Sequence, residues 1–231
     1  MTSIRRTLGA AGALVVLTGC GSSFADEPAA DIEKAATTDM KAVKSLHLSG
    51  EVTTQSEEVT LDLTLTDEGN CEGEVGIQGG TAQIISLDGE SWFKADDAFW
   101  EASAGQAADQ IIKLVGDKWV VQPGDESFAA FCDLDTLLKE LGSDDSEDAD
   151  AKKQEDTEEI DGQEAVVLDS ETDDGDPLTA WVSVDDPHHI LQLEVTEGEE
   201  PGKVTFSAFD EDVAIEPPAE EDTIDLSKLA G

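Results

Sequence analysis

The sequence predicts an α+β fold in which about three helices lie against one face of a curved antiparallel sheet of about nine to ten strands. Many segments alternate apolar and polar residues, which is the pattern of strands buried on one side only. Turn signals such as Asp88-Gly89 separate these segments and favour hairpins. Stretches with helical spacing divide the strands into two meander runs, and this order argues against βαβ units.

The chain begins with the pattern of a secretory signal. Arg5 and Arg6 form a basic start, and the apolar run Leu8–Leu17 follows. This run is about half of the roughly 20 apolar residues needed to span a bilayer. The segment therefore predicts export, by the Sec or the twin-arginine route, rather than a membrane-spanning helix.

Leu17-Thr18-Gly19-Cys20 resembles a bacterial lipobox, in which the cysteine is diacylated and becomes the mature N-terminus. The alternative for Cys20 is an ordinary core or disulfide cysteine. We expect residues 1–19 to be a lipoprotein signal peptide, 20–28 a lipidated tether and 29–231 a single domain. The diacylglyceryl group on Cys20 would anchor this domain at the extracytoplasmic face of the cell membrane.

Two cysteines remain once Cys20 is modified. Cys71 and Cys132 form an even pair in an oxidising compartment, which predicts a disulfide. Such a bridge closes a loop of about 60 residues and stabilises the fold by roughly 4 kcal/mol through the unfolded chain. Two free buried thiols are the alternative.

The first part of the mature chain combines one helix with a run of strands. Residues 26–46 place apolar side chains at helical spacing, which predicts an amphipathic helix. Residues 59–66 alternate strictly and predict a strand with one wet face. Further strands are expected at 71–77, 82–87 and 91–94, joined by turns at 67–70, 79–80 and 88–89.

The second part begins with two helical stretches. They span 104–115 and 127–141, with Ser127 as the expected N-cap of the later one. Residues 143–159 hold nine acids, two lysines and no large apolar residue, so a flexible acidic loop is expected there. Extended segments are expected at 118–121, 165–168, 179–184, 190–195 and 204–208.

The charge balance excludes two classes of partner. Lys and Arg total 13 against 55 Asp and Glu, and the formal net charge is −42 at pH 7. Nucleic-acid binding is excluded because phosphate contacts need clustered basic side chains. A polybasic membrane-surface module is excluded for the same reason.

Catalytic signatures are missing from the sequence, which has no nucleophile elbow, zinc-protease motif, dinucleotide fingerprint or P-loop. His188 and His189 follow a turn at 185–187 and are interpreted as turn residues facing water; a metal site with neighbouring acids is the alternative. The acidic run 144–150 lacks the spacing of a calcium loop. We expect no enzyme activity, no catalytic residues, no bound metal and no cofactor.

Several segments together resemble a known family. They are the lipobox, Val43-Lys-Ser-Leu-His-Leu-Ser-Gly50, Asp67-Glu-Gly-Asn-Cys-Glu-Gly73, Gly116-Asp-Lys-Trp-Val120 and Val204-Thr-Phe-Ser-Ala-Phe-Asp210. In this combination the chain is similar to actinobacterial envelope lipoproteins of the LppX/LprG group, whose fold resembles LolA and LolB. The resemblance implies a half-barrel sheet over helices, enclosing a hydrophobic cavity for acylated lipids or lipoglycans.

A cavity of this kind would be lined by apolar side chains of the sheet and helices. The alternative is that these side chains form an ordinary packed core, in an envelope lipoprotein that has no ligand and acts through protein partners of unknown identity. The expected lining residues are Leu61, Leu63, Leu65, Val75, Ile77, Ile85, Trp92, Ile111, Phe128, Phe131 and Leu138.

Overall fold

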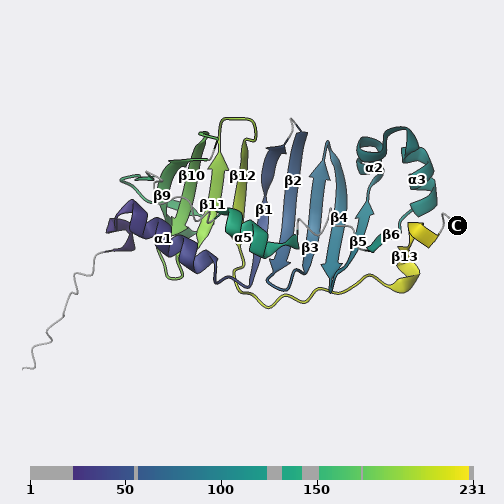
Figure 1. Ribbon diagram of the computed structural model, residues 1–231, viewed down its shortest axis with the longest axis horizontal. Helices are drawn as coiled ribbons and strands as arrows, with labels where there is room; N and C mark the ends of the chain where they lie inside the picture. Colours follow the sequence, from purple (N-terminus) through teal and green to yellow (C-terminus); the bar gives the residue numbers. More distant parts are fainter. Residues whose placement is uncertain (1–22, 55–56, 124–131, 142–150, 173, 229–231) are drawn as a thin grey trace, which may run out of the picture.

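A computed structural model describes residues 23–54, 57–123, 132–141, 151–172 and 174–228. The predicted α+β class is confirmed, because these residues form one large sheet with helices beside it (Figure 1). The helices are α1 (Ala29–Met40), α2 (Asp97–Ala104), α3 (Ala108–Val115) and α5 (Leu134–Leu141). Short 3-10 turns occur at Phe24–Asp26, Gly105–Ala107, Glu220–Asp222 and Leu226–Lys228.

The sheet has 13 strands within the described residues, in the order β13-β6-β5-β4-β3-β2-β1-β12-β11-β10-β9-β7, and β8 pairs with β9 outside this path. It is mixed, because β13 pairs with β6 in parallel while the other pairs are antiparallel. The strands are β1 (Ser45–Thr54), β2 (Glu57–Thr66), β3 (Cys71–Ile77), β4 (Gly80–Leu87), β5 (Glu90–Ala95), β6 (Trp119–Pro123), β7 (Lys152–Lys153), β8 (Glu158–Ile160), β9 (Gln163–Glu171), β10 (Pro177–Ser183), β11 (Ile190–Val195), β12 (Gly202–Ser207) and β13 (Thr223–Ile224).

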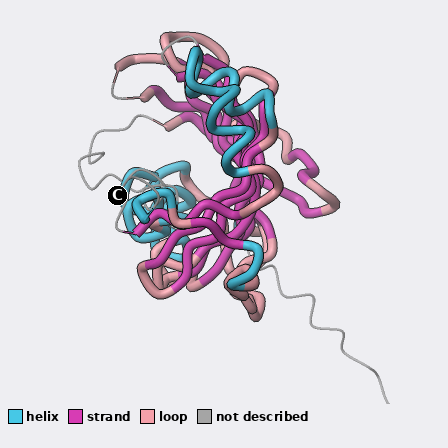
Figure 2. Tube along the Cα trace, turned by 90° about the vertical axis from the view of Figure 1, so that its right-hand side faces the viewer, coloured by secondary structure: helices cyan, strands magenta, loops and turns pink. Residues whose placement is uncertain are grey.

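The sheet is bent and does not close on itself. Figure 2 shows the strands curving around one side of the molecule, and β13 and β7 stand at its two ends. Residues of α1 and α5 share one apolar core with residues of the sheet, so these helices pack on the side that we call the inner face. Figure 1 shows α1 and α5 lying across the strands on that side.

The strand count exceeds the prediction for a simple reason. Ten strands match the nine to ten expected, and the other three, β7, β8 and β13, are two or three residues long. Strands this short contain too few residues to show an alternating pattern. The strand β7 and the first two residues of β8 lie within the predicted acidic loop 143–159, and both strands pair with β9. The loop prediction is therefore wrong for residues 152–153 and 158–159. Residues 142–150 lie outside the described residues.

The helices also differ from the prediction. The first helix ends at Met40 instead of continuing to residue 46, because β1 already begins at Ser45. The helix expected at 104–115 is a 3-10 turn followed by α3. The prediction missed α2, which Asp96 caps by accepting a hydrogen bond from the backbone N–H of Phe99 at 2.7 Å.

The last helix is described from Leu134 onward, so the expected cap at Ser127 lies outside the described residues. Asp133 caps the described part, since its carboxylate accepts hydrogen bonds from the backbone N–H of Thr136 at 2.9 Å and its hydroxyl at 2.8 Å. These bonds to the charged form hold the pKa of Asp133 below its usual value.

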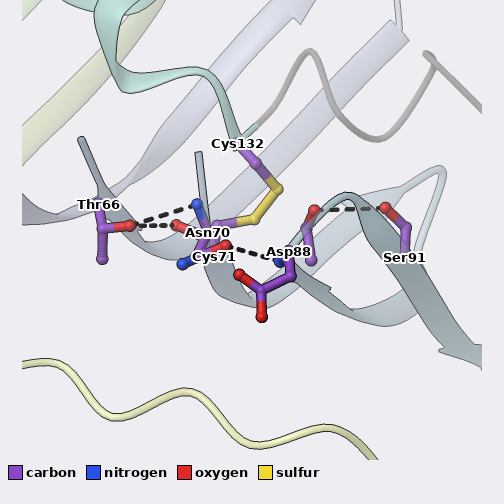
Figure 3. Close-up of a disulfide and its surroundings, with 7 residues drawn as sticks. Thr66, Asn70, Cys71, Asp88, Ser91 and Cys132 are labelled. Carbon is purple, nitrogen blue, oxygen red and sulfur yellow. Dashed lines mark hydrogen bonds between the residues drawn. A yellow bond between two sulfur atoms is a disulfide. The ribbon is translucent and has the colours of Figure 1, made fainter. Parts of the chain in front are cut away.

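The predicted disulfide is confirmed. Cys71 and Cys132 are bonded, with their Cα atoms 5.2 Å apart and 61 positions apart in the sequence (Figure 3). The bond joins the first residue of β3 to the segment before α5. It therefore fastens α5 to the middle of the sheet.

Both terminal segments pack against the sheet. Lys153 Nζ donates hydrogen bonds to the carbonyls of Ala25 and Glu27, so residues of the expected tether lie on the domain. The segment after β12 runs along the lower edge of the strands in Figure 1 and reaches β13. None of the helices in the described part of the chain has the length and apolar character needed to cross a bilayer.

Candidate ligand-binding face

The strand register assigns alternate side chains to the inner face of the sheet. Leu48 lies opposite Leu63 on β2 and Phe206 on β12, and Leu46 lies opposite Leu65. Directly opposed residues point to the same face. One inner row is therefore Phe206, Leu48, Leu63, Gly73, Ile84, Phe93 and Val120, which runs across seven adjacent strands.

Apart from half-buried Gly73, this row and the row formed by Leu46, Leu65 and Cys71 are buried. Phe206 is 1% exposed and Leu63 is 2% exposed. They belong to one core with Ile32 and Met40 of α1 and with Leu134 and Leu138 of α5. The helices thus cover the inner face toward the end of the strands where β1 begins.

Toward the other end of the same strands, the inner face is only partly covered. Val59, Val75 and Ala82 are buried there, while the apolar residues around them are half-buried. Leu193, Val204, Gly50 and Leu61 oppose one another across β11, β12, β1 and β2. We call the half-buried apolar residues at this end the inner band; they pack against the core without being enclosed by it. The inner band consists of Val52, Leu61, Ile77, Ala95, Ala180, Leu193 and Val204.

A helical arm made of α2 and α3 flanks this end of the sheet (Figure 1). It packs on β4 at Gly80, where a Cβ atom would lie 2.1 Å from the amide nitrogen of Phe99, so only glycine fits. Ile111 and Ile112 of α3 are half-buried against the core, and Leu114 is 53% exposed. The arm therefore adds apolar surface beside the inner band.

The structure brings most of the expected lining residues together. Five of them, on β2 and β3, share the inner face, and Ile111 and Leu138 contribute to the same core. Those five are Leu61, Leu63, Leu65, Val75 and Ile77.

Two expected lining residues lie elsewhere. Ile85 is opposite Trp92, and both alternate with inner-face Ile84 and Phe93, so they point to the outer face. The structure therefore does not place Ile85 or Trp92 with the other lining residues. Phe128 and Phe131 lie outside the described residues.

The sequence interpretation also missed inner-face residues on strands joined late in the chain. Leu193 and Val204 reach the inner band because β12 pairs with β1, about 150 residues away in sequence. The alternation of Val204 and Phe206 was visible, but it does not identify the partner strand. Pairing over this distance left no local signal.

The histidines of the 185–189 turn are packed against aromatic rings, so the interpretation that they face water is wrong. The His188 ring stacks on Phe24 with centroids 3.5 Å apart, and buried His189 stacks on Phe209 at 4.1 Å. Burial lowers the pKa of His189, and nearby Asp210, Asp39 and Asp186 partly oppose this shift. In the part of the chain that the structure describes, no three His, Cys, Asp or Glu side chains are grouped to hold a metal.

Two solved mycobacterial structures are similar to this fold. LprF from Mycobacterium bovis matches with a TM-score of 0.57 and 16% identity, over 82% of this chain and 96% of LprF. The lipoprotein LppX from Mycobacterium tuberculosis matches with a TM-score of 0.52 and 16% identity, over 82% of this chain and 100% of LppX. This chain has the LppX/LprF fold.

The resemblance seen in the sequence is thus confirmed at the level of the fold. No protein-family model matches the sequence, and no curated protein matches it either.

Proposed function

We propose that this protein is a membrane-anchored lipoprotein of the cell envelope that binds the acyl chains of a lipid on the inner face of its sheet, without catalysis. The observation that carries the proposal is the inner band, where apolar side chains of adjacent strands remain half-buried beside a sealed core. The LppX/LprF fold supports the proposal, since LppX is itself a lipoprotein.

The energetics favour an acyl chain as the ligand. Burying a chain of about fourteen carbons at about 0.8 kcal/mol per methylene contributes about 11 kcal/mol before costs. Association and ordering cost several kcal/mol, which leaves a useful affinity without any polar contact. The inner band consists of Val, Leu, Ile and Ala side chains, which match this chemistry.

Substituting a residue of the inner band tests the proposal directly. Leu61→Trp places a larger side chain in the inner band, between Gly50 and Val75 on the neighbouring strands. We expect it to weaken binding of the fluorescent fatty acid cis-parinaric acid at least tenfold, because the ring occupies the space of the acyl chain. Ile85→Trp is the matched control, because Ile85 is also half-buried but points to the outer face.

Circular dichroism and the Tm establish that both variants are folded. Equal binding by Leu61→Trp and Ile85→Trp would contradict binding on the inner face. If native mass spectrometry of the protein purified from its own host finds no lipid and the wild type does not bind the probe, lipid binding is wrong. The protein would then be a ligand-free envelope lipoprotein that acts through protein partners.

The anchor at Cys20 is part of the proposal and has its own test. Lys34 is the first basic residue after Cys20, so trypsin releases residues 20–34 as one peptide. We expect mass spectrometry to find diacylglycerol on Cys20 of this peptide, and Cys20→Ser to move the protein from the membrane fraction to the soluble fraction. An unmodified Cys20, or a mature chain that begins elsewhere, would refute the anchor.

A further inference from the structure

A separate pocket lies on the outer face of the sheet, where the C-terminal segment packs against β5 and β6. Trp92 and Val121 are opposite each other on these strands and point away from the inner face. Residues 217–228 cover them and leave a pocket of about 660 Å³. The pocket is lined by Glu90, Trp92, Val121, Pro217, Pro218, Glu220, Thr223, Ile224, Asp225 and Lys228.

The pocket combines aromatic and apolar side chains with negative charge. Trp92 is 9% exposed, and Val121 and Ile224 add aliphatic surface beside it. Glu90 and Glu220 are exposed at the pocket. Lys228 is the cationic residue of the lining, and its Nζ lies 3.0 Å from the carboxylate of Asp225, which offsets its charge. Glu90 and Glu220 therefore leave the pocket net negative.

The indole of Trp92 provides a second, independent observation. The indole N–H of Trp181 donates to Glu158 at 2.8 Å, as a buried tryptophan usually does. Within the described residues no acceptor takes a hydrogen bond from the N–H of Trp92, although its side chain is about nine-tenths buried. An indole N–H is a donor only, so it is available to an acceptor oxygen of a ligand and not to an ammonium group.

We propose that this outer pocket binds a small organic cation that carries an alkylammonium group and an oxygen atom able to accept the hydrogen bond of the Trp92 indole. The face of an indole attracts such a cation through its quadrupole, and the apolar lining matches the alkyl substituents. The carboxylates of Glu90 and Glu220 add Coulomb attraction, and the net charge of −42 concentrates cations around the molecule. This site is on the opposite face from the proposed lipid site and does not depend on it.

Tetramethylammonium chloride is the probe for the ammonium part of this ligand, with sodium chloride at equal ionic strength as the reference. In saturation-transfer NMR and calorimetric titrations of the full chain, we expect saturable binding of tetramethylammonium in the millimolar range. Trp92→Leu should weaken it at least tenfold, and Glu90→Gln about threefold. Glu74→Gln is the matched control, since Glu74 is an exposed carboxylate on β3 that also points to the outer face, and it should leave binding unchanged.

Leu61→Trp, which blocks the inner band, should also bind tetramethylammonium like the wild type, and this result separates the two sites. Binding that does not saturate, or that sodium matches at the same ionic strength, would mean an ion atmosphere only and would overturn the site. Equal losses in Glu90→Gln and Glu74→Gln would overturn it as well. If Trp92→Leu does not fold, the comparison of tetramethylammonium binding between Glu90→Gln and Glu74→Gln still tests the site.

Discussion

Two adjacent histidines join segments that are far apart in the sequence. His188 stacks on Phe24 from the N-terminal segment, and its backbone N–H donates to the Asp39 carboxylate at 2.8 Å. His189 stacks on Phe209, which follows β12. These contacts place a buried imidazole where the two terminal segments meet the sheet.

The depressed pKa of His189 predicts a pH dependence of stability. The unfolded chain takes up a proton on His189 near its ordinary pKa of about 6.5, while the folded protein resists it because the ring is buried. The contribution of neutral His189 to the free energy of unfolding is therefore complete above about pH 6.5, and it is lost as the pH falls toward the lower pKa of the folded protein. The Tm measured from pH 7.5 to 5.5 should fall more steeply for the wild type than for His189→Phe, which keeps an aromatic ring beside Phe209. Parallel curves would show that His189 does not contribute.

Among the elements, β1 shows how the sheet is able to bend. A Cβ atom at Gly50 would lie 2.2 Å from the carbonyl oxygen of Lys203 on the neighbouring strand. Cβ atoms do not approach backbone oxygens this closely, so a side chain here would push β1 and β12 apart. Gly50 lies in the row of Leu61 and Val204, so its small size allows the close strand contact at the centre of the inner band.

Gly50→Ala should lower the free energy of unfolding by about 2–3 kcal/mol, since either the strand pairing or the curvature has to change. Gly162→Ala is the control: φ there is +84° and no atom lies within 4 Å of the added Cβ, so only backbone strain of about 1 kcal/mol is expected. Urea denaturation measures the free energy of unfolding of both variants and of the wild type. A loss at Gly50 no larger than that at Gly162 would contradict the close contact.

Strands such as β2 were predictable because they alternate over several residues and end at a turn signal. The strand β9 was predictable from its apolar run 165–168, whose residues are buried in two separate clusters. The face of the sheet to which Ile85 points was not predictable. Ile84 and Ile85 are both apolar, and the next inner-face positions hold Ser86 and Ser91. These serines are buried and lie 3.3 Å apart, Oγ to Oγ (Figure 3). The sequence suggested the wrong face because polar residues occupy an inner row there.

For the molecule as a whole, electrostatic repulsion opposes folding. The chain carries 55 acidic residues and only 13 Lys and Arg residues. The described residues form few ion pairs, so most of their negative charges have no positive partner nearby. Compact folding brings these like charges closer together than they are in the unfolded chain, at a cost that depends on screening.

We therefore expect the Tm to rise with sodium chloride. Most of the rise should occur below about 0.3 M, since the Debye length already falls from about 30 Å at 0.01 M to about 8 Å at 0.15 M. Calorimetry at fixed pH between 0.01 and 1 M measures this effect. A Tm that is flat or falling, or one that rises only near 1 M, would mean that screening of like charges is not the cause.

With the anchor proposed at Cys20, the docking of Phe24 and Ala25 onto the domain would also limit how the domain lies on the membrane. With the acyl chains proposed at Cys20, four peptide units separate the anchor from Phe24, a reach of about 14 Å at most. The β9–β11 end, where His188 holds Phe24, would then rest on the lipid headgroups. The α2–α3 arm lies at the other end of the long axis in Figure 1, so it would be the part of the domain that can extend farthest from the membrane.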